Sequence, residues 1–276
     1  IKLIMIKNTV IITAEKKDQT IIKTIQSCLK QTNKDLEIIV AYSKFEDESN
    51  IKKNIKSKEV IFLKIKKKLK NKVQDQLFKI KQSLKISKGT NIFLLDGDDI
   101  FNKKKIEIIS KILNCKELMI LDNYYVVKNN KKIKNFPQNY KNNYFYLKLI
   151  NDWPKNICTS AISINKEFLS EFFKEVKINK YKYLAIDVLL AIYCNNKNKL
   201  LRINKFFTSK VELDQSVDKD YIGYRNSFYW HRRLEQHNYN FFIKKKNYFN
   251  LDYFVSYILS YFFKINSKFF QNVKND

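Results

Sequence analysis

The feature of the sequence that most constrains its fold is an apolar run that ends in three closely spaced carboxylates. Residues 91–95 (Asn-Ile-Phe-Leu-Leu) are followed directly by Asp96, Gly97, Asp98 and Asp99. Such a run is typical of a strand buried in a parallel sheet, and open α/β sheets bind ligands beyond the carboxyl ends of these strands. Because the acids repel one another, Mg²⁺ or Mn²⁺ is the simplest compensation, since these ions prefer oxygen ligands. A solvated Asp-Gly turn is the alternative interpretation.

Composition restricts the class of protein further. The 276 residues are 45% hydrophobic, which is enough for a core, and the three Gly and two Pro are too few for an all-β sandwich with many tight turns. The four cysteines lie far apart and form no C-x-x-C pair. They therefore indicate free thiols in a reducing compartment rather than zinc ligands or a disulfide framework.

The charge of the chain is strongly positive. The net charge of +27 comes from lysines spread along the whole sequence, which favours a generally basic surface over a nucleic-acid-binding motif. Such a surface suits contact with anionic lipid. The chain contains no run of 18 uncharged apolar residues and no signal peptide before the first strand. We therefore expect a cytoplasmic protein, with peripheral contact at the inner face of the cytoplasmic membrane as a further expectation.

Strand and helix patterns alternate through the first hundred residues. Apolar runs rich in β-branched residues predict strands, and apolar residues at helical spacing predict helices, one capped by Asp18 and one closed by Gly89. The predicted strands are 9–13, 36–41, 60–63 and 91–96, and the predicted helices are 18–31 and 73–87. This order is typical of a nucleotide-binding α/β sheet, mostly parallel and flanked by helices.

The pattern after residue 100 is less regular. It predicts a helix at 103–113, a strand at 118–121, a loop at 128–143, a half-buried strand at 159–164, a helix from 166 and an apolar helix at 183–193. Aromatic residues dominate from Phe206 onward. Within that part, residues 251–263 form an aromatic amphipathic stretch that is too short to cross a bilayer, and it suits either a core contact or a membrane surface.

Three segments carry a resemblance to a known family. The first reads Ser-Cys-Leu-Lys-Gln-Thr at 27–32 and Asp-Leu-Glu-Ile-Ile-Val at 35–40, and the second is 88–99. The third is the pair at 159–160, followed by a helix that bears Asp187. They resemble the S-x-L-x-Q-T … D-x-E-I-I-V, G-x-x-I-x-x-L-D-x-D-D and E-D motifs of the family-2 type of inverting glycosyltransferases, which have the GT-A fold. The resemblance covers about 200 residues and implies a GT-A domain at 1–205 with a mainly helical extension at 206–276.

The resemblance implies a nucleotide-diphospho-sugar donor and a divalent cation, Mn²⁺ or Mg²⁺. It implies that Asp98 binds the cation, which neutralises the diphosphate leaving group. It also implies that Asp96 accepts hydrogen bonds from the donor ribose and that Asp99 supports the site. Further donor contacts are expected from Thr13, Glu15, Ser43, Lys72, Arg232 and Arg233, and acceptor-side contacts from Thr159 and Ser160.

Asp187 is the candidate general base. A carboxylate in the apolar segment 183–189 is costly to bury unless it faces a cleft, and desolvation raises its pKa toward a value useful for a base. The alternative is an outward-facing or capping helix acid. Arg232 and Arg233 follow Trp230, and arginine matches phosphate oxygens bidentately. Solvated arginines beside a buried tryptophan are the alternative there.

The chain also departs from the family pattern. The family carries an acidic pair after the second strand, which holds the nucleotide base, and residues 41–43 here are Ala-Tyr-Ser. The Arg-Asn pair of the helix before the acidic motif is absent, and Lys72 or Lys79 would supply a cation instead. A non-catalytic relative that binds a nucleotide sugar is therefore one alternative function.

Two other classes compete less well. Haloacid-dehalogenase-type phosphatases begin with a D-x-D motif that continues Gly-Thr, whereas this motif lies near residue 96 and continues Ile100-Phe101. A basic nucleic-acid-binding protein would need a module motif that the sequence does not show. The expected acceptor is a glycan, either lipid-linked or part of a cell-surface polysaccharide. The sugar, the nucleotide and the oligomeric state are left open.

Overall fold

The computed structural model describes residues 7–15, 20–45, 47–66, 69–115, 118–128, 131–136, 154, 156–212, 227–245 and 250–272, with side chains up to 263 in the last range. The chain divides into two compact units. The first comprises Ile1–Pro137, Asn156–Lys180 and Ala185–Glu212, and the second comprises Gln138–Lys155, Tyr181–Leu184 and Leu213–Asp276. The expected boundary after residue 205 falls within the strand Leu200–Val211. The division into domains 1–205 and 206–276 therefore stays a prediction.

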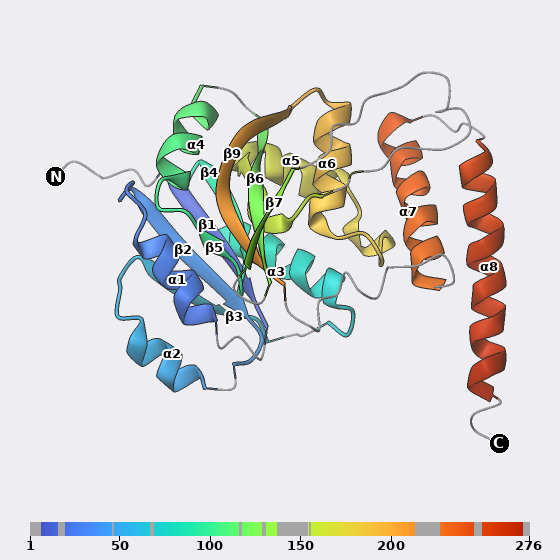
Figure 1. Cartoon of the computed structure of the whole chain (residues 1–276), viewed down its shortest axis with the longest axis horizontal. Helices are drawn as coiled ribbons and strands as arrows, with labels where there is room; N and C mark the ends of the chain where they lie inside the picture. Colours follow the sequence, from blue (N-terminus) through green and yellow to red (C-terminus); the bar gives the residue numbers. More distant parts are fainter. Residues whose placement is uncertain are drawn as a thin grey trace. The chain divides into compact units, whose positions relative to one another are not determined.

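The strands described in the first unit form one mixed sheet (Figure 1). They are β1 (Asn8–Ala14), β2 (Leu36–Tyr42), β3 (Val60–Lys64), β4 (Asn91–Asp96), β5 (Ile100–Phe101), β6 (Met119–Lys128), β7 (Lys131–Asn135), β8 (Ile162–Asn165) and β9 (Leu200–Val211). Their order is β3-β2-β1-β4-β8-β6-β9-β5, with β7 paired to β6. The pairs among β1 to β4 are parallel, whereas β8 runs antiparallel to both β4 and β6. "Mostly parallel" thus describes the first half of the sheet.

Helices cover both faces of this sheet (Figure 1). The described helices of the first unit are α1 (Ile21–Leu29), α2 (Glu48–Asn54), α3 (Lys72–Ile86), α4 (Lys105–Leu113), α5 (Lys166–Glu175) and α6 (Ile186–Asn196). Apolar residues of α1, α2 and α4 share one core cluster with alternate residues of the central strands. On the other face, α3 contacts β1, β2, α5 and α6. Because both faces are covered, Val10, Ile11 and Ile12 are all fully buried, which explains the continuous apolar runs of the sequence.

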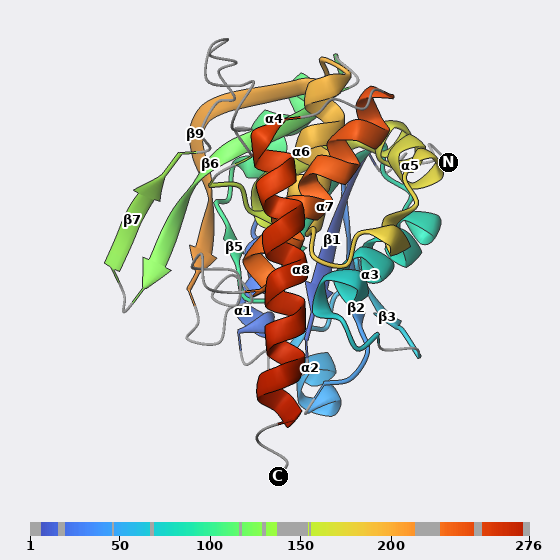
Figure 2. The same ribbon diagram turned by 90° about the vertical axis from the view of Figure 1, so that its right-hand side faces the viewer.

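Several predicted elements differ from the structure. The loop prediction was wrong for 131–135, since these residues form β7 and pair with β6 in an exposed hairpin (Figure 2). Polar residues are tolerated in β7 because this strand of the hairpin is exposed to water. Part of the strand expected at 159–164 is a 3-10 turn, Thr159–Ala161, and the apolar helix begins at Ile186 rather than at 183. Residues 206–211 are strand, so the extension is not helical from its start. Asp18 lies outside the described residues.

Gly89 is needed for close approach rather than for capping. The helix α3 ends at Ile86 with Ser87 as its cap, so the expected glycine cap at 89 was wrong. A Cβ at Gly89 would lie 2.6 Å from the backbone carbon of Asn8 and 2.6 Å from Thr9 Oγ1. Any side chain would therefore push the turn before β4 away from β1. β1 pairs with β4, the strand that ends in the acidic motif.

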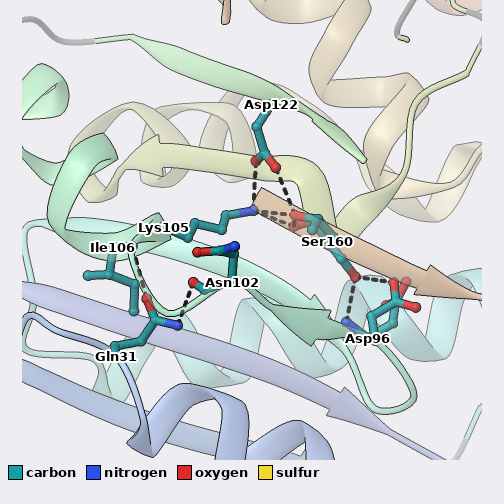
Figure 3. A network of polar contacts seen from close by, with 9 residues as sticks. Gln31, Asp96, Asn102, Lys105, Ile106, Asp122 and Ser160 are labelled. Atoms are coloured by element: carbon teal, nitrogen blue, oxygen red, sulfur yellow. Dashed lines mark hydrogen bonds and ion pairs between the residues drawn. The ribbon is translucent and has the colours of Figure 1, made fainter. Parts of the chain in front are cut away.

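Two residues of the first motif segment hold the chain that follows β4. The side chain of Gln31 donates to the carbonyl of Asn102 (2.9 Å) and accepts from the amide of Ile106 (3.1 Å), as Figure 3 shows. Ser27 Oγ accepts from the amide of Phe101 at 3.2 Å. The S-x-L-x-Q segment of α1 thus fixes the chain that follows the acidic motif and leads into α4.

The second unit contains two described helices, α7 (Ser227–Lys244) and α8 (Leu251–Asn272), which lie side by side (Figures 1 and 2). Arg233 of α7 binds Asp252 of α8 through Nε at 2.7 Å and Nη2 at 2.9 Å. His237 Nε2 lies 3.0 Å from the same carboxylate. Neither of these helices nor any other that the structure describes is long and apolar enough to cross a membrane.

Candidate active site

The acidic motif forms a tight turn at the carboxyl end of β4. Asp96 is the last residue of the strand, and the amide of Asp99 donates to its carbonyl at 3.1 Å. The turn is tied to its neighbours by Gly97, whose amide donates to the carbonyl of Thr13 (3.0 Å) and whose carbonyl accepts from Thr24 Oγ1 (3.0 Å). Asp96 and Asp98 are half-buried, and Asp99 is buried. The sequence therefore brings three carboxylates to the strand end where open α/β sheets bind ligands.

Asp96 is held by polar groups from three elements. Its Oδ1 accepts from Thr13 Oγ1 at 3.1 Å and from Gln76 Nε2 at 2.7 Å. Its amide donates to Ser160 Oγ at 3.0 Å (Figure 3). Gln76 Nε2 also lies 3.4 Å from Thr159 Oγ1, so α3 connects the acidic turn to the segment at 159–160. The predicted residues Thr13, Asp96, Thr159 and Ser160 thus lie together.

The carboxylates at this turn destabilise one another's charged forms. Burial and the neighbouring Asp98 raise the pKa of Asp96 to about 6, against the opposing influence of Lys210 on β9. Burial, Asp98 and Asp96 raise the pKa of Asp99 well above its ordinary value. Such shifts arise when like charges share a poorly solvated place, and they are frequent at functional sites.

Asp99 is anchored from two sides. Its Oδ2 accepts from Ser160 Oγ at 2.5 Å, and its Oδ1 accepts from the amide of Val211 on β9 at 2.9 Å. Both oxygens therefore accept hydrogen bonds from the protein, and the supporting role expected for Asp99 stays a prediction.

The oxygen atoms at the turn suit a divalent cation completed by a substrate. Among the described residues no group of three or more His, Cys, Asp and Glu side chains is arranged to hold a metal by itself. Magnesium, however, is usually bound by one or two carboxylates together with substrate phosphates. The crowded pair Asp96 and Asp98 fits that kind of site, because a cation would relieve the repulsion that raises the pKa of Asp96.

The remaining predicted donor residues of the first unit follow the carboxyl ends of β1 and β2 or begin α3. Glu15 and Lys72 are exposed. Ser43 follows β2, and its Oγ is buried with no hydrogen-bond partner among the described residues. Tyr42, which stands where the family carries an acid, is buried and donates from its hydroxyl to Glu48 at 2.7 Å.

Lys79 does not replace the missing arginine directly. Its ammonium is buried, pairs with Asp75 at 2.8 Å and donates to the carbonyl of Ala14 at 2.8 Å. Lys79 therefore holds the chain just after β1 and is used within the fold. The other candidate, Lys72, lies on the surface at the first turn of α3.

Asp187 is the second residue of α6 and is half-buried between the buried Ile186 and Val188. Its Oδ1 accepts from the amide of Val188 at 2.7 Å. A carboxylate in the first turn of a helix is favoured by the positive end of the helix dipole. Its role as a base stays a prediction.

The two arginines belong to α7 of the second unit. The guanidinium of Arg233 is held by the bidentate contact with Asp252, and Trp230 is buried. Arg232 is half-buried. Donor binding by Arg232 and Arg233 stays a prediction.

Sequence reasoning missed three residues around the acidic turn. Gln76, Lys105 and Lys210 contact or face its carboxylates or their anchors. A polar Gln76 between the apolar positions 73, 77 and 80 of α3 was a signal, because a core-facing polar side chain needs a partner. Lys105 and Lys210 gave none, since they stand among many lysines in the sequence.

The fold resembles that of known glycosyltransferase structures. A crystal structure of S. aureus TarS residues 1–349 superposes with a TM-score of 0.59 at 13% identity, and covers 84% of this chain and 65% of its own. The complex of the same protein with UDP-GlcNAc gives 0.60 at 12% identity, with 84% and 66% coverage. This chain thus spans just under two thirds of the length of those structures, and at this identity the likeness shows the fold. No curated protein matches the sequence.

The sequence also matches a family model. The model of glycosyl transferase family 2 covers residues 9–176, which is more than half of the 276 residues. The predicted α/β GT-A class and the resemblance stated from the motifs are confirmed by this match and by the structural neighbours. The chain belongs to glycosyl transferase family 2.

Proposed function

We propose that this protein transfers a sugar, with inversion, from a nucleotide-diphospho-sugar to a hydroxyl group of a glycan, either lipid-linked or part of a cell-surface polysaccharide. The observation that carries the proposal is the crowding of Asp96, Asp98 and Asp99 at the end of β4 in a chain of family 2. Three acids that repel one another weaken the fold, and a cation with a diphosphate would offset that cost.

The donor would bind across the ends of β1, β2 and β4. Asp98 holds Mn²⁺ or Mg²⁺, and Asp96 accepts from the ribose, while Thr13 and Gln76 fix the orientation of Asp96. When bound, the cation neutralises the charge that develops on the leaving diphosphate. The buried and unpaired hydroxyl of Ser43 supports a contact with the nucleotide base, because a buried polar group gains most from a ligand partner.

Glu15, Lys72 and the arginines complete the proposed donor contacts. Lys72 and Glu15 are exposed and accessible to a ligand. A cation within electrostatic reach of Asp96 is Lys210, and we add it as a candidate for the diphosphate. Arg232 and Arg233 are both kept as proposed contacts, and the guanidinium of Arg233 also binds Asp252.

Asp187 is the proposed base. The acceptor oxygen attacks the anomeric carbon from the face opposite the diphosphate, its proton passes to the Asp187 carboxylate, and the bond from the anomeric carbon to the diphosphate oxygen breaks. Thr159 is the proposed acceptor-side contact. Ser160 is assigned a supporting role instead, because its hydroxyl is engaged by Asp99 and by the amide of Asp96.

The test compares wild type with Asp98→Asn and Asp187→Asn, using Glu167→Gln, an exposed helix acid, as the matched control. UDP-GlcNAc is the first donor to try, because a structural neighbour was crystallised with it. We expect Mn²⁺-dependent release of UDP by wild type and the control. Asp98→Asn should lose donor affinity, whereas Asp187→Asn should bind the donor and not transfer it. Full turnover by both variants with every nucleotide sugar would contradict the proposal.

A non-catalytic relative is the second candidate. The observation that favours it is Tyr42, which stands where the family carries an acid that holds the nucleotide base. Its hydroxyl donates to Glu48 instead. Thermal shifts with nucleotide sugars and Mn²⁺, without transfer to any acceptor, would favour this candidate.

The helix α8 supports peripheral contact with an anionic membrane. Its buried side is polar, with Asp252, Ser256 and Ser260, and its apolar residues face outward. The exposed apolar face consists of Phe254, Tyr257, Ile258, Tyr261 and Phe262, at the spacing of one helix side. The charged residue within 251–263, Asp252, is paired and buried, so nothing on that side repels anionic lipid. Basic chains with an aromatic helix face bind such surfaces.

Vesicle binding tests this contact. We expect sedimentation of wild type with vesicles that contain anionic lipid, and loss of it in Tyr257→Glu/Tyr261→Glu. Phe228→Glu changes an exposed aromatic residue of α7 and should leave binding unchanged. Equal sedimentation of the double variant would contradict lipid as the partner. A dimer that the double variant disrupts would also contradict it and would point to a second copy of the chain. We propose a cytoplasmic location at the inner membrane face on the same grounds.

A further inference from the structure

A lysine is fully buried beneath the acidic turn. Lys105, the first residue of α4, has no exposed surface, and neither has its partner Asp122 on β6. Its Nζ lies 2.7 Å from Asp122 Oδ1 and donates to the carbonyl of Ser160 at 2.7 Å (Figure 3). It also donates to Thr208 Oγ1 at 2.8 Å. An ammonium group has three protons, so every one of them has an acceptor.

The lysine connects to the acidic turn through Ser160. While the carbonyl of this serine accepts from Lys105, its hydroxyl donates to Asp99 and accepts from the amide of Asp96. One residue in a 3-10 turn therefore joins the buried ion pair to the carboxylate of Asp99 and to the backbone of Asp96. The start of α4, and with it the direction of the Lys105 side chain, is also fixed by Gln31, which accepts from the amide of Ile106, the next residue of the helix.

A requirement for stability explains this ion pair poorly. Burying two charges costs about as much as their attraction returns, and apolar residues of similar volume often stabilise a core as well or better. An apolar residue, however, cannot hold a carbonyl in a fixed direction. The pair supplies that hydrogen bond at a place where the backbone of Ser160 must be held.

We propose that the buried Lys105–Asp122 pair is a positioning device that sets Asp96 and Asp99 for donor binding through Ser160. The proposal rests on the function proposed above only for its consequence in catalysis. Lys105 is a positioning residue, because it contacts Ser160 rather than any group placed at the donor. Thr208 completes the device, since its hydroxyl lies 2.8 Å from Asp122 Oδ2 and 3.1 Å from the Ser160 carbonyl.

Amide hydrogen exchange tests the positioning without any ligand. The variant Lys105→Met/Asp122→Leu replaces the pair with apolar residues and leaves no single charge buried. We expect its melting temperature to stay near that of wild type, while the amides of Asp96 and Val211, which depend on Ser160 and Asp99, lose protection at least tenfold. The control Ile109→Val trims the same helix at a core position and should not change these two amides selectively. Unchanged protection in the double variant would overturn the proposal, whatever the donor is.

A second variant covers the case in which the double variant fails to fold. Thr208→Val keeps the ion pair and removes the hydroxyl that contacts Lys105, Asp122 and Ser160. We expect a smaller loss of protection at the same two amides, and protection equal to wild type would contradict the device.

Ligand measurements then connect the device to the proposed reaction. With Mn²⁺ and UDP-GlcNAc as probes, the double variant should show a weaker donor affinity and a lower kcat than wild type. Adding Ser160→Ala should have a smaller effect in the double variant than in wild type, because both changes break the same connection through Ser160. Failure of wild type to bind any nucleotide sugar would contradict the proposed function. The amide exchange result would then still test the positioning role of the Lys105–Asp122 pair. If the double variant loses amide protection at Asp96 and Val211 but keeps normal donor affinity and kcat, the Lys105–Asp122 pair has a structural role only. That result would overturn its role in donor binding.

Discussion

The two units of this protein treat a buried carboxylate in opposite ways. At the end of β4, burial and the neighbouring acids raise the pKa of both Asp96 and Asp99. Between α7 and α8, burial by itself would raise the pKa of Asp252, but hydrogen bonds from His237 and Arg233 lower it overall. The first arrangement lacks sufficient positive charge, and the second is satisfied within the protein.

The difference distinguishes a group of residues suited to binding a ligand from a contact that stabilises helix packing. A carboxylate with its cations already present stabilises helix packing and needs no ligand. Crowded carboxylates weaken the native state, and such local cost is characteristic of functional sites. Lys105 and Asp122 combine both cases, because their charges are paired with each other and the pair holds Ser160, which contacts the crowded acids.

The largest effect is expected from Asp98→Asn. Its loss should lower the rate of sugar transfer by about 100-fold or more, as expected when a charge-stabilising group is removed. The melting temperature should not fall in proportion, because the change relieves repulsion with Asp96 and Asp99. Steady-state kinetics and thermal unfolding of the same samples check both parts. A large loss of stability would place this acid with Asp252 as a structural residue.

Asp252→Asn should produce the opposite signature. The variant leaves Arg233 and the buried His237 without a charged partner, and breaking such a pair costs about 3 kcal/mol of unfolding free energy. Urea unfolding measures this loss. The folded pKa of Asp252 is lowered, so its contribution is present above the ordinary value of 3.8 and disappears as the pH falls through the lowered value. Equal stability of variant and wild type at neutral pH would contradict the comparison.

A change in pH dependence, rather than a loss of activity or folding, is expected at Glu235 of α7. Burial raises the pKa of this carboxyl group to about 7, although its oxygens accept from the amides of Lys182 (2.9 Å) and Tyr183 (2.8 Å). The folded state therefore binds the proton more tightly than the unfolded state, and stability falls as the pH rises from 4.5 through 7. Glu235→Gln should flatten that slope in thermal unfolding across this range. A slope unchanged by the substitution would show that other groups carry it.

The sequence predicted the parallel half of the fold well because its signals are local. The strand positions at residues 9–13, 36–41 and 91–96 follow from apolar runs, and the placement of Asp96 to Asp99 follows from where the last run ends. The hairpin at 131–135 was missed because polar strands on an exposed hairpin carry no apolar pattern. The start of the apolar helix was also misplaced, since nothing local distinguishes Tyr183 from Ile186.

The roles of individual polar residues depended on contacts that are distant in sequence. Gln31 belonged to a family motif, but its use as the anchor of 102–106 appears only when α1 and α4 lie together. Arg233 was predicted to bind phosphate, and the structure gives it a partner 19 residues away. Likewise, the aromatic stripe of α8 has helical spacing in the sequence, yet only packing on α7 decides that its polar side is the buried one.

The sequence by itself therefore determined the parallel half of the sheet, the family and the position of the three carboxylates, because strand hydrophobicity and turn residues act between neighbours in the chain. Only the tertiary structure decided which lysine lies under that turn. Among the Lys and Arg residues that the structure describes, Lys105 is fully buried against Asp122, Thr208 and Ser160, which come from three other segments. The selection of one cation among many is a matter of burial and direction, and neither is written in local sequence.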